Sequence, residues 1–321
     1  MNILITGGAG FIGSNLVENF LQDDRIDLVR VIDDFSNGYL HNVEEFLGRP
    51  KYEFLEGDIC DYDFCLKATE GINRITHQAA LGSVPRSIEN PMRTNEVNVG
   101  GTVNLLHAAK VNGVDRIVLA CSSSTYGDSK DLPKAEERIG NPLSPYAVSK
   151  LTVEIYADVF QKSYGLDFIG LRYFNIFGPR QNPSNPYAAV IPIFCQAFMD
   201  ERRPTINGDG LTSRDFTYVE NAINANKLAL FSENKEALNE VYNVACGNQV
   251  TLNEMVEILQ EHTGMDIIPI YGPERSGDVK HSRADISKIN RLLRYEPKVH
   301  FSEGLSRVYQ WYKENQDVLN F

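Results

Sequence analysis

Short apolar runs alternate with longer amphipathic stretches through the first half of the chain. This alternation is typical of a parallel sheet covered by helices on both faces. The longer stretches predict helices near Pro91–Asn112 and near Pro145–Tyr164. The apolar runs predict strands at Asn2–Thr6, Leu28–Asp33, Tyr52–Glu56, Arg74–Gln78, Arg116–Cys121 and Phe168–Arg172. We therefore predict an α/β fold built on a doubly wound parallel sheet of the Rossmann type.

The pattern becomes less regular after Gly178, where proline and glycine clusters and shorter apolar runs begin. A strand at Val241–Val244 and helices near Leu252–Glu261 and Ser302–Glu314 are predicted there. We expect a larger Rossmann domain and a smaller α/β substrate-binding domain. Their predicted bounds are residues 1–178, joined again by residues from about 215 to 250, and residues 179–321.

Composition narrows the classes of partner. The 321 residues carry 31 Lys and Arg against 43 Asp and Glu, a formal charge of −12. An acidic chain without a dense basic run repels polyanions, so we expect neither nucleic acid nor a membrane surface as partner. Small anions held by a few arginines remain compatible with it.

The spacing of the cysteines and the first residues of the chain indicate the cellular compartment of the protein. The five cysteines lack the spacing of a zinc site or a disulfide framework, so we expect no metal. The chain shows no secretory leader and no apolar run of membrane-spanning length. These features predict a cytoplasmic protein.

A glycine cluster follows the first strand directly and is spaced Gly7-x-x-Gly10-x-x-Gly13. Glycines at a strand-to-helix turn let backbone N–H groups approach a pyrophosphate, which then faces the helix N-terminus. Asp33 ends the next strand, 20 residues after Gly13. A carboxylate there accepts hydrogen bonds from ribose hydroxyls and repels a 2′-phosphate. The cluster therefore predicts bound NAD rather than NADP.

A tyrosine and a lysine lie at the start of the second predicted helix. Ser144 suits the N-cap, and Tyr146 and Lys150, four residues apart, then share one face. We expect the ammonium beside the phenol, where it favours the ionised form. For a general base near neutral pH, the pKa of a tyrosine must fall from about 10 to about 7, which requires about 4 kcal/mol.

Serines end the strand that precedes this helix. Ser122 and Ser123 emerge at the carboxyl edge of the predicted sheet, where doubly wound folds bind their ligands. Either hydroxyl can serve a reacting oxygen there or can cap nearby backbone groups.

Together these residues resemble the extended short-chain dehydrogenase/reductase family, in particular its nucleotide-sugar 4-epimerases. The resemblance covers nearly the whole chain. Further motifs that carry it are Gly57-Asp58-Ile59, His77-Gln78-Ala79-Ala80, Asn98-Val99-Gly100-Gly101-Thr102, Arg172 to Gly178, Ser213-Arg214-Asp215-Phe216 and Arg275-Ser276-Gly277-Asp278.

The resemblance implies that Tyr146 removes the proton of the sugar 4-hydroxyl while the C4 hydride passes to NAD. The 4-keto sugar then turns, and the hydride returns to its other face. Ser122 or Ser123 is implied to hydrogen-bond the reacting oxygen, and Lys150 completes the catalytic set. The cofactor residues implied are Gly7, Gly10, Phe11, Ile12, Gly13, Asp33, Asn37, Asp58, Ile59, Gln78, Ala79, Ala80, Asn98, Tyr146, Lys150 and Tyr173.

For the substrate, the resemblance implies a UDP-sugar whose diphosphate is clamped by Arg214 and Arg275. Ser282 matches a gatekeeper position, where a tyrosine restricts the pocket to glucose and galactose and a small residue admits an N-acetyl group. This implies an NAD-dependent isomerase for UDP-GlcNAc and UDP-GalNAc, serving polysaccharide biosynthesis. The substrate residues implied are Ser83, Ser122, Tyr146, Asn175, Val190, Asn207, Arg214, Arg275, Asp278 and Ser282.

Other readings remain open. The protein could act on UDP-glucose and UDP-galactose, or on UDP-glucuronate, for which Arg86 is the candidate cation. A catalytically silent NAD-binding regulator is the alternative outside enzymes. Dehydratases of the family carry Asp-Glu where this chain has Ser123 and Ser124, and decarboxylases carry Glu at Ser124, so both activities are disfavoured. The two long helices resemble those of a four-helix bundle between subunits, which implies a homodimer.

Overall fold

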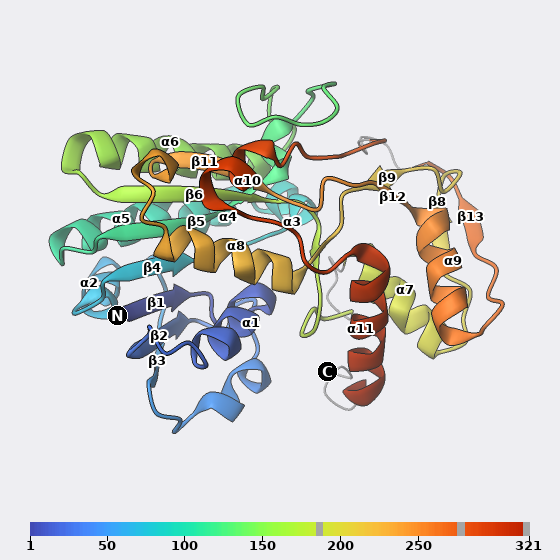
Figure 1. The fold of residues 1–321 in the computed structure, drawn as a ribbon, viewed down its shortest axis with the longest axis horizontal. Coiled ribbons are helices and arrows are strands. Elements are labelled where there is room, and N and C mark those ends of the chain that lie inside the picture. The colour runs from blue at the N-terminus through green and yellow to red at the C-terminus, as the bar shows by residue number, and fades with distance from the viewer. Residues whose placement is uncertain (184–188, 275–279, 317–321) are drawn as a thin grey trace.

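A seven-stranded sheet forms the larger part of the molecule (Figure 1). The computed structural model describes residues 1–183, 189–274 and 280–316. Every pair of neighbouring strands in this sheet is parallel, and the order is β11-β6-β5-β4-β1-β2-β3. The bounds are β1 Asn2–Thr6, β2 Leu28–Asp33, β3 Tyr52–Glu56, β4 Arg74–His77, β5 Arg116–Ser122, β6 Asp167–Tyr173 and β11 Glu240–Val244.

This strand order confirms the predicted Rossmann-type α/β fold, since the chain reverses direction across the sheet between β1 and β4. The first three strands have the predicted bounds; β4 and β5 differ from them by one residue at one end, and β6 by one residue at each end. β11 lies far along the chain and pairs with β6 from Glu240 opposite Ile169 to Val244 opposite Tyr173. The sheet therefore includes a late segment of the sequence.

Helices cover both faces of the sheet (Figure 1). The alternating side chains of β1 show why: Ile3 and Ile5 belong to one buried cluster and Leu4 to another. The first cluster includes α1 (Phe11–Phe20) and α8 (Val219–Phe231). The second includes α2 (Tyr62–Thr69), α5 (Thr102–Val111) and α6 (Pro145–Tyr164).

Helix α6 has the predicted bounds because both of its ends carry local signals. The Ser144 hydroxyl accepts a hydrogen bond from the backbone N–H of Ala147 at 3.1 Å. Gly165, with φ +73°, takes the left-handed conformation that ends the helix. The predicted helix therefore places Tyr146 in its first turn and Lys150 one turn later.

The other long helix is not continuous, which corrects the prediction for Pro91–Asn112. It consists of α4 (Pro91–Asn95), a π-helical segment at Glu96–Gly101 and α5. A Cβ on Gly101 would come within 2.6 Å of the Ile59 side chain, so the glycine permits a close approach at this point. Such π segments interrupt helices mainly at functional sites.

A smaller lobe beside the sheet contains short strands and several helices (Figure 1). β8 pairs with β13 in parallel and β9 with β12 in antiparallel, while β7 pairs with β10. The bounds are β7 Ile176–Phe177, α7 Val190–Met199, β8 Thr205–Asn207, β9 Ser213–Arg214, β10 Thr217–Tyr218, β12 Val250–Thr251, α9 Leu252–Thr263, β13 Ile270–Gly272 and α11 Phe301–Glu314. Two further helices, α3 (Val84–Glu89) and α10 (Ser287–Leu293), lie outside this lobe.

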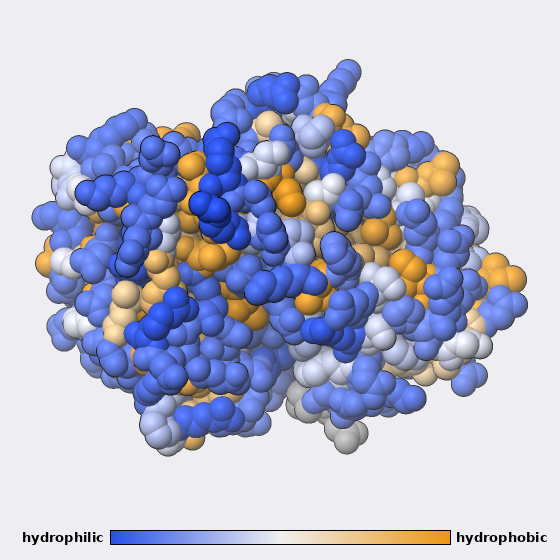
Figure 2. All heavy atoms as spheres, in the orientation of Figure 1, coloured by the Kyte–Doolittle hydropathy of each residue, from blue (hydrophilic) through white to orange (hydrophobic). Residues whose placement is uncertain are grey.

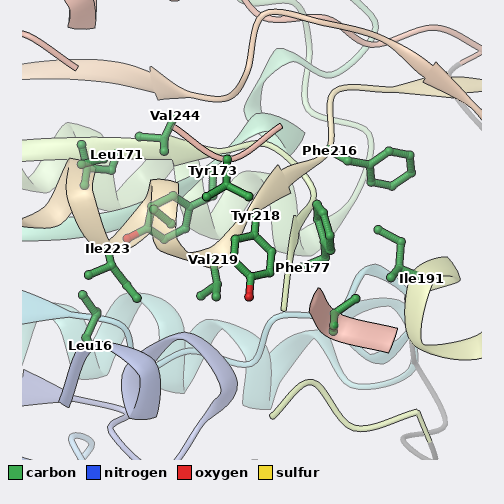
Figure 3. Packing of buried hydrophobic residues seen from close by; sticks show 14 of the residues in the cluster. Leu16, Leu171, Tyr173, Phe177, Ile191, Phe216, Tyr218, Val219, Ile223 and Val244 are labelled. Carbon is green, nitrogen blue, oxygen red and sulfur yellow. The ribbon is translucent and has the colours of Figure 1, made fainter. Parts of the chain in front are cut away.

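Aromatic packing joins this lobe to the sheet. The Phe177 ring lies 5.6 Å from that of Tyr218 and 5.5 Å from that of Phe301, measured between centroids. Figure 3 shows Tyr218 beside the sheet residue Tyr173, with Phe177 and Phe216 on one side of this pair and Leu171 on the other. All five belong to one buried cluster, so the lobe and one face of the sheet share a core.

The surface agrees with the acidic composition. Hydrophilic residues predominate on the face seen in Figure 2, with hydrophobic residues between them. Among the described helices, none combines the length and the apolar character needed to cross a bilayer.

Candidate active site

Two adjoining cavities lie beside the carboxyl edge of the sheet. The first is about 420 Å³ and the second about 290 Å³, and Asn175 and Ile176 line both. Fifteen of the sixteen residues implied to bind the cofactor line the first cavity: Gly7, Gly10, Phe11, Ile12, Gly13, Asp33, Asn37, Asp58, Ile59, Gln78, Ala79, Ala80, Tyr146, Lys150 and Tyr173.

The glycine turn forms one wall of the first cavity. Gly7 has φ +67° and its N–H donates to the Ile32 carbonyl at 2.8 Å. A Cβ on Gly13 would lie 2.1 Å from the Gly7 carbonyl oxygen, so the turn closes only with glycine at that position. No side chain caps the N-terminus of α1 at Gly10, which leaves N–H groups of its first turn for a ligand. This cradle fits the pyrophosphate of a dinucleotide.

Asp33 is fixed at the end of β2 by backbone groups. One carboxylate oxygen accepts the N–H of Ala9 at 2.8 Å and the other the N–H of Phe35 at 2.9 Å. Burial raises the pKa of Asp33, and these two hydrogen bonds oppose that rise. A carboxylate has about four acceptor positions. Two of them therefore remain for ribose hydroxyls, as the sequence predicted for NAD.

Arg86 lies by the same end of the cavity. Its guanidinium donates to the Asn37 amide oxygen at 3.1 Å, and Asn37 lines the cavity next to the loop that follows Asp33. The sequence reading had placed Arg86 near the sugar pocket as a cation for a uronate. The hydrogen bond to Asn37 does not test that assignment, which stays a prediction.

Asn98 is not among the residues that line this cavity, and its assignment to the cofactor stays a prediction. Its amide oxygen accepts the N–H of Leu81 at 2.8 Å, and its amide nitrogen donates to the Ser149 hydroxyl at 3.0 Å. These bonds use both the oxygen and the nitrogen of the amide. Asn98 lies in the π-helical segment, and it is only 1% exposed. Asn98 therefore ties the cavity wall at Leu81 to α6.

Tyr146 and Lys150 both line the first cavity, but the lysine takes a different partner from the one expected. The Lys150 ammonium donates to the Ala120 carbonyl at 2.7 Å. Burial raises the pKa of Tyr146, and a hydrogen bond with Ser122 opposes the rise. Cys121 raises this pKa as well, and the lowering expected from Lys150 together with an oxidised nicotinamide stays a prediction. Burial also lowers the pKa of Lys150, opposed by Cys121 and Glu154.

Ser122, rather than Ser123, faces the cavity. Ser122 lines it at the end of β5, and its hydroxyl oxygen accepts hydrogen bonds from the Ser124 hydroxyl at 2.9 Å and the Ser124 N–H at 3.2 Å. Ser123 begins a 3-10 turn and is not among the described residues of either lining. The sequence could not separate the two, because both follow the strand directly.

The second cavity collects residues implied to bind the substrate. Asn175, Val190, Asn207 and Arg214 line it. The Arg214 guanidinium donates to its neighbour's carbonyl, that of Ser213, at 3.0 Å. The sequence did not identify several lining residues as substrate contacts, although Ile176, Phe177 and Phe216 stood in quoted motifs. The others include Phe194, Thr205, Thr212 and Leu252.

Four other residues implied to bind the substrate behave differently. The Ser83 hydroxyl accepts the Arg86 N–H and caps α3, and Ser282 is half-buried beside Ser213. Neither of them is among the described residues that line the two cavities. Arg275 and Asp278 lie outside the described residues.

Among the residues that the structure describes, no group of three or more acidic, histidine or cysteine side chains is placed to hold a metal.

Comparison with known proteins defines the class. The chain belongs to the extended short-chain dehydrogenase/reductase family, since residues 4–308 match the family described as GDP-mannose 4,6 dehydratase. The family resemblance predicted from the motifs is thereby confirmed.

Within that family, several solved relatives are named UDP-sugar 4-epimerases, and others are dTDP-glucose 4,6-dehydratases. The UDP-N-acetylglucosamine 4-epimerase of Methanobrevibacter ruminantium M1, solved with UDP-N-acetylmuramic acid, is 38% identical with a TM-score of 0.90, covering 98% of each chain. The UDP-glucose 4-epimerase of Thermotoga maritima, solved with UDP-glucose, is 34% identical with a TM-score of 0.91, covering 98% of this chain and 100% of that one.

A third relative was solved with a cofactor. The UDP-glucuronic acid 4-epimerase of Bacillus cereus, in complex with UDP-glucuronic acid and NAD, is 31% identical with a TM-score of 0.90, covering 98% of this chain and 99% of that one. The prediction of NAD as cofactor is confirmed at this level. The relatives support an NAD-dependent UDP-sugar 4-epimerase, and their names differ in the hexose.

Proposed function

We propose that this protein interconverts UDP-GlcNAc and UDP-GalNAc by epimerisation at C4, through a transient 4-keto sugar. The observation that carries the chemistry is the position of Tyr146 and Ser122 on the wall of the first cavity, which adjoins the second at Asn175. A hexose that extends from the second cavity would bring its C4 hydroxyl towards this wall.

Bound NAD supplies an acceptor for the C4 hydride and later returns it. The Tyr146 phenolate removes the proton of the 4-hydroxyl, and the Ser122 hydroxyl orients that oxygen by a hydrogen bond. After the keto sugar has turned, Tyr146 returns the proton to the new alcohol. Hydride and proton both return, so the reaction involves no net oxidation.

Ionisation of Tyr146 requires positive charge, because burial raises its pKa. The buried Lys150 ammonium and the oxidised nicotinamide are the two charges that would supply it. Lys150 is already oriented by its hydrogen bond to Ala120, so little rearrangement is needed.

The preference for an N-acetyl sugar rests on Ser282. A serine at the gatekeeper position leaves space beside the sugar 2-substituent, and the relative with 38% identity is named a UDP-N-acetylglucosamine 4-epimerase. Arg214 would hold the diphosphate, with Arg275 as its predicted partner. Dehydration is disfavoured because Ser123 and Ser124 stand where an acid and a base would be needed.

UDP-glucose is a second candidate substrate. The relative solved with UDP-glucose is 34% identical over nearly the whole chain, and a pocket large enough for an acetamido group also admits a hydroxyl. We therefore expect activity on plain hexoses as a lesser reaction of the same site.

A homodimer is also part of the proposal. Helix α6 exposes Val148, Ile155 and Val159, with Ile155 56% exposed, and these positions lie on one face of the helix. Met92 of α4, which is 80% exposed, comes from an element that packs against α6. A contiguous apolar patch of this kind is typical of a protein interface.

The test is product identification. The purified protein is incubated separately with UDP-GlcNAc, UDP-glucose and UDP-glucuronate, and products are separated by chromatography. We expect UDP-GalNAc from the first at the highest kcat/KM, together with a bound nicotinamide absorbance that changes on addition of UDP-sugar. Turnover of UDP-glucuronate alone would overturn the choice of sugar. Bound NAD without epimerisation of any substrate would favour the silent regulator.

A further inference from the structure

The segment Lys280–Asp285, called the Ser282 strip below, is held along both edges by backbone hydrogen bonds. On one edge the Ser282 N–H donates to the Ser213 carbonyl at 3.2 Å, and the Ser213 N–H donates to the Lys280 carbonyl at 3.0 Å. On the other edge the Lys134 N–H donates to the Arg283 carbonyl at 2.8 Å. The strip is therefore held in place by its neighbours on both edges and is not a free loop.

Asp215 is the side chain that anchors this strip from within. It is fully buried, and its carboxylate accepts the N–H of Ala284 at 3.1 Å. The same carboxylate accepts the N–H groups of Cys246 at 2.9 Å and Gly247 at 3.0 Å, which belong to the connection after β11. One side chain thus joins the strip to the loop that leaves the sheet.

The chemistry of these partners requires a carboxylate. All three are N–H donors, and an ionised carboxylate is an acceptor at every one of its positions. An asparagine of the same shape would turn an NH₂ group towards an N–H and leave at least one buried donor without a partner. Asp215 also directly follows Arg214, whose guanidinium lines the second cavity.

We propose that Asp215 is a positioning residue that fixes the Ser282 strip relative to Arg214, and so sets the distance between the diphosphate clamp and the wall at the sugar 2-substituent. This inference rests on the proposed function and adds the source of its selectivity. Asp215 acts on the Ser282 backbone and on Arg214, and not on the reacting atoms. Loss of the Asp215 carboxylate should therefore alter the fit of the substrate more than the chemical step.

Ionisation of Asp215 is consistent with this role. Burial raises the pKa of Asp215 to about 6, while the backbone N–H groups oppose the rise. The charged form therefore predominates in assays at about pH 8. Cys246 and Tyr295 are the titratable groups that act on it, and burial raises the pKa of both, so they stay neutral there.

The test compares D215N with D61N at about pH 8. Asp61 is a matched control, because its exposed carboxylate also accepts two backbone N–H groups, as the N-cap of α2 far along the chain from the strip. For D215N we expect the KM for UDP-GlcNAc to rise about tenfold with kcat changed less than about threefold, as the loss of a charge-assisted hydrogen bond would produce. The ratio of kcat/KM between UDP-GlcNAc and UDP-glucose should shift as well.

A purely structural role would lower the melting temperature without moving that ratio. A folded D215N protein with unchanged KM and unchanged ratio would therefore overturn the inference, and D61N should leave both quantities unchanged. Binding of UDP-GlcNAc, followed by calorimetry, keeps the test independent of turnover: if the wild type binds this ligand but does not epimerise it, the proposed function fails while the role of Asp215 is still measured.

If D215N does not fold, S213A replaces it. The Ser213 hydroxyl lies 2.9 Å from the His281 ring nitrogen, so its loss loosens the same strip without burying a new polar group. We expect a smaller rise in KM and a shift of the sugar ratio in the same direction. An S213A enzyme indistinguishable from wild type in both would count against anchoring of the strip as the source of selectivity.

Discussion

The Lys150 ammonium is hydrogen-bonded to the Ala120 carbonyl oxygen, so helix α6 is tied directly to strand β5. Both residues line the first cavity. The bond keeps a buried cation at the site without placing it on the phenol of Tyr146. In the proposed mechanism the oxidised nicotinamide adds the second positive charge that favours ionisation of Tyr146.

Replacing Tyr146 by phenylalanine should abolish epimerisation while leaving the cofactor bound. The substitution removes only the hydroxyl, and loss of a general base costs about 100-fold to 10,000-fold in kcat. Product formation is measured beside the nicotinamide absorbance of the purified protein. Y164F is the control, since Tyr164 lies on the same helix and is largely exposed. Residual activity within about tenfold of wild type would exclude Tyr146 as the base.

Replacing Ser122 by alanine should move the pH profile of kcat/KM to higher pH. The Ser122 hydrogen bond stabilises the phenolate and so lowers the pKa of Tyr146. Without it the pKa rises further, less of the base is ionised at a given pH, and the ascending limb shifts upward. S123A should keep the wild-type profile, because Ser123 does not line the described cavities. The opposite result for the two variants would reverse the assignment.

Replacing Ser282 by tyrosine should close the space for the acetamido group. We expect kcat/KM for UDP-GlcNAc to fall at least about 100-fold while that for UDP-glucose stays within about threefold, because only the larger 2-substituent clashes. S282A serves as control and should keep both substrates. Equal losses on the two sugars would show that Ser282 does not discriminate between them.

Replacing Gly13 by alanine should destroy the cofactor cradle. The new Cβ would lie 2.1 Å from the Gly7 carbonyl oxygen, so the turn must open, and overpacking of this kind costs about 1–3 kcal/mol or more. We expect a lower melting temperature and a protein purified without nicotinamide. G100A is matched to it, since a Cβ on Gly100 meets nothing within 4 Å. Normal cofactor content in G13A would contradict the assignment of the turn.

Replacing Ile155 by arginine should dissociate the proposed dimer, because the charge would be buried without a partner at the interface. Analytical ultracentrifugation should show a dimer for wild type and a monomer for the variant. The control, I268R, changes a residue of similar exposure near β13, at 59% against 56%. A wild-type protein that sediments as a monomer would refute the proposal directly.

Local signals made much of this structure predictable. Helix α6 could be placed to the residue, because Ser144 and Gly165 mark its ends within the sequence itself. The buried strands could be placed almost as well, since each is a compact apolar run. The glycine turn and Asp33 were found for the same reason, because their spacing is short and their roles depend on adjacent backbone.

Residues whose role depends on distant partners were beyond the sequence. Asn98 bonds to Leu81, and the partners of Asp215 lie about 30 and 70 positions further along the chain. Neither pairing leaves a periodic trace. The strands of two or three residues in the smaller lobe, such as β9 and β12, are also too short to show alternation.

The late arrival of β11 has a consequence for synthesis of the protein. Until Glu240–Val244 have emerged from the ribosome, β6 presents an open, apolar edge, and the large sheet is finished only after part of the smaller lobe has been translated. While residues 174–244 are translated, this edge of β6 must therefore be protected from pairing with other strands. Separate expression of the first 178 residues should yield an aggregating fragment rather than a cofactor-binding module.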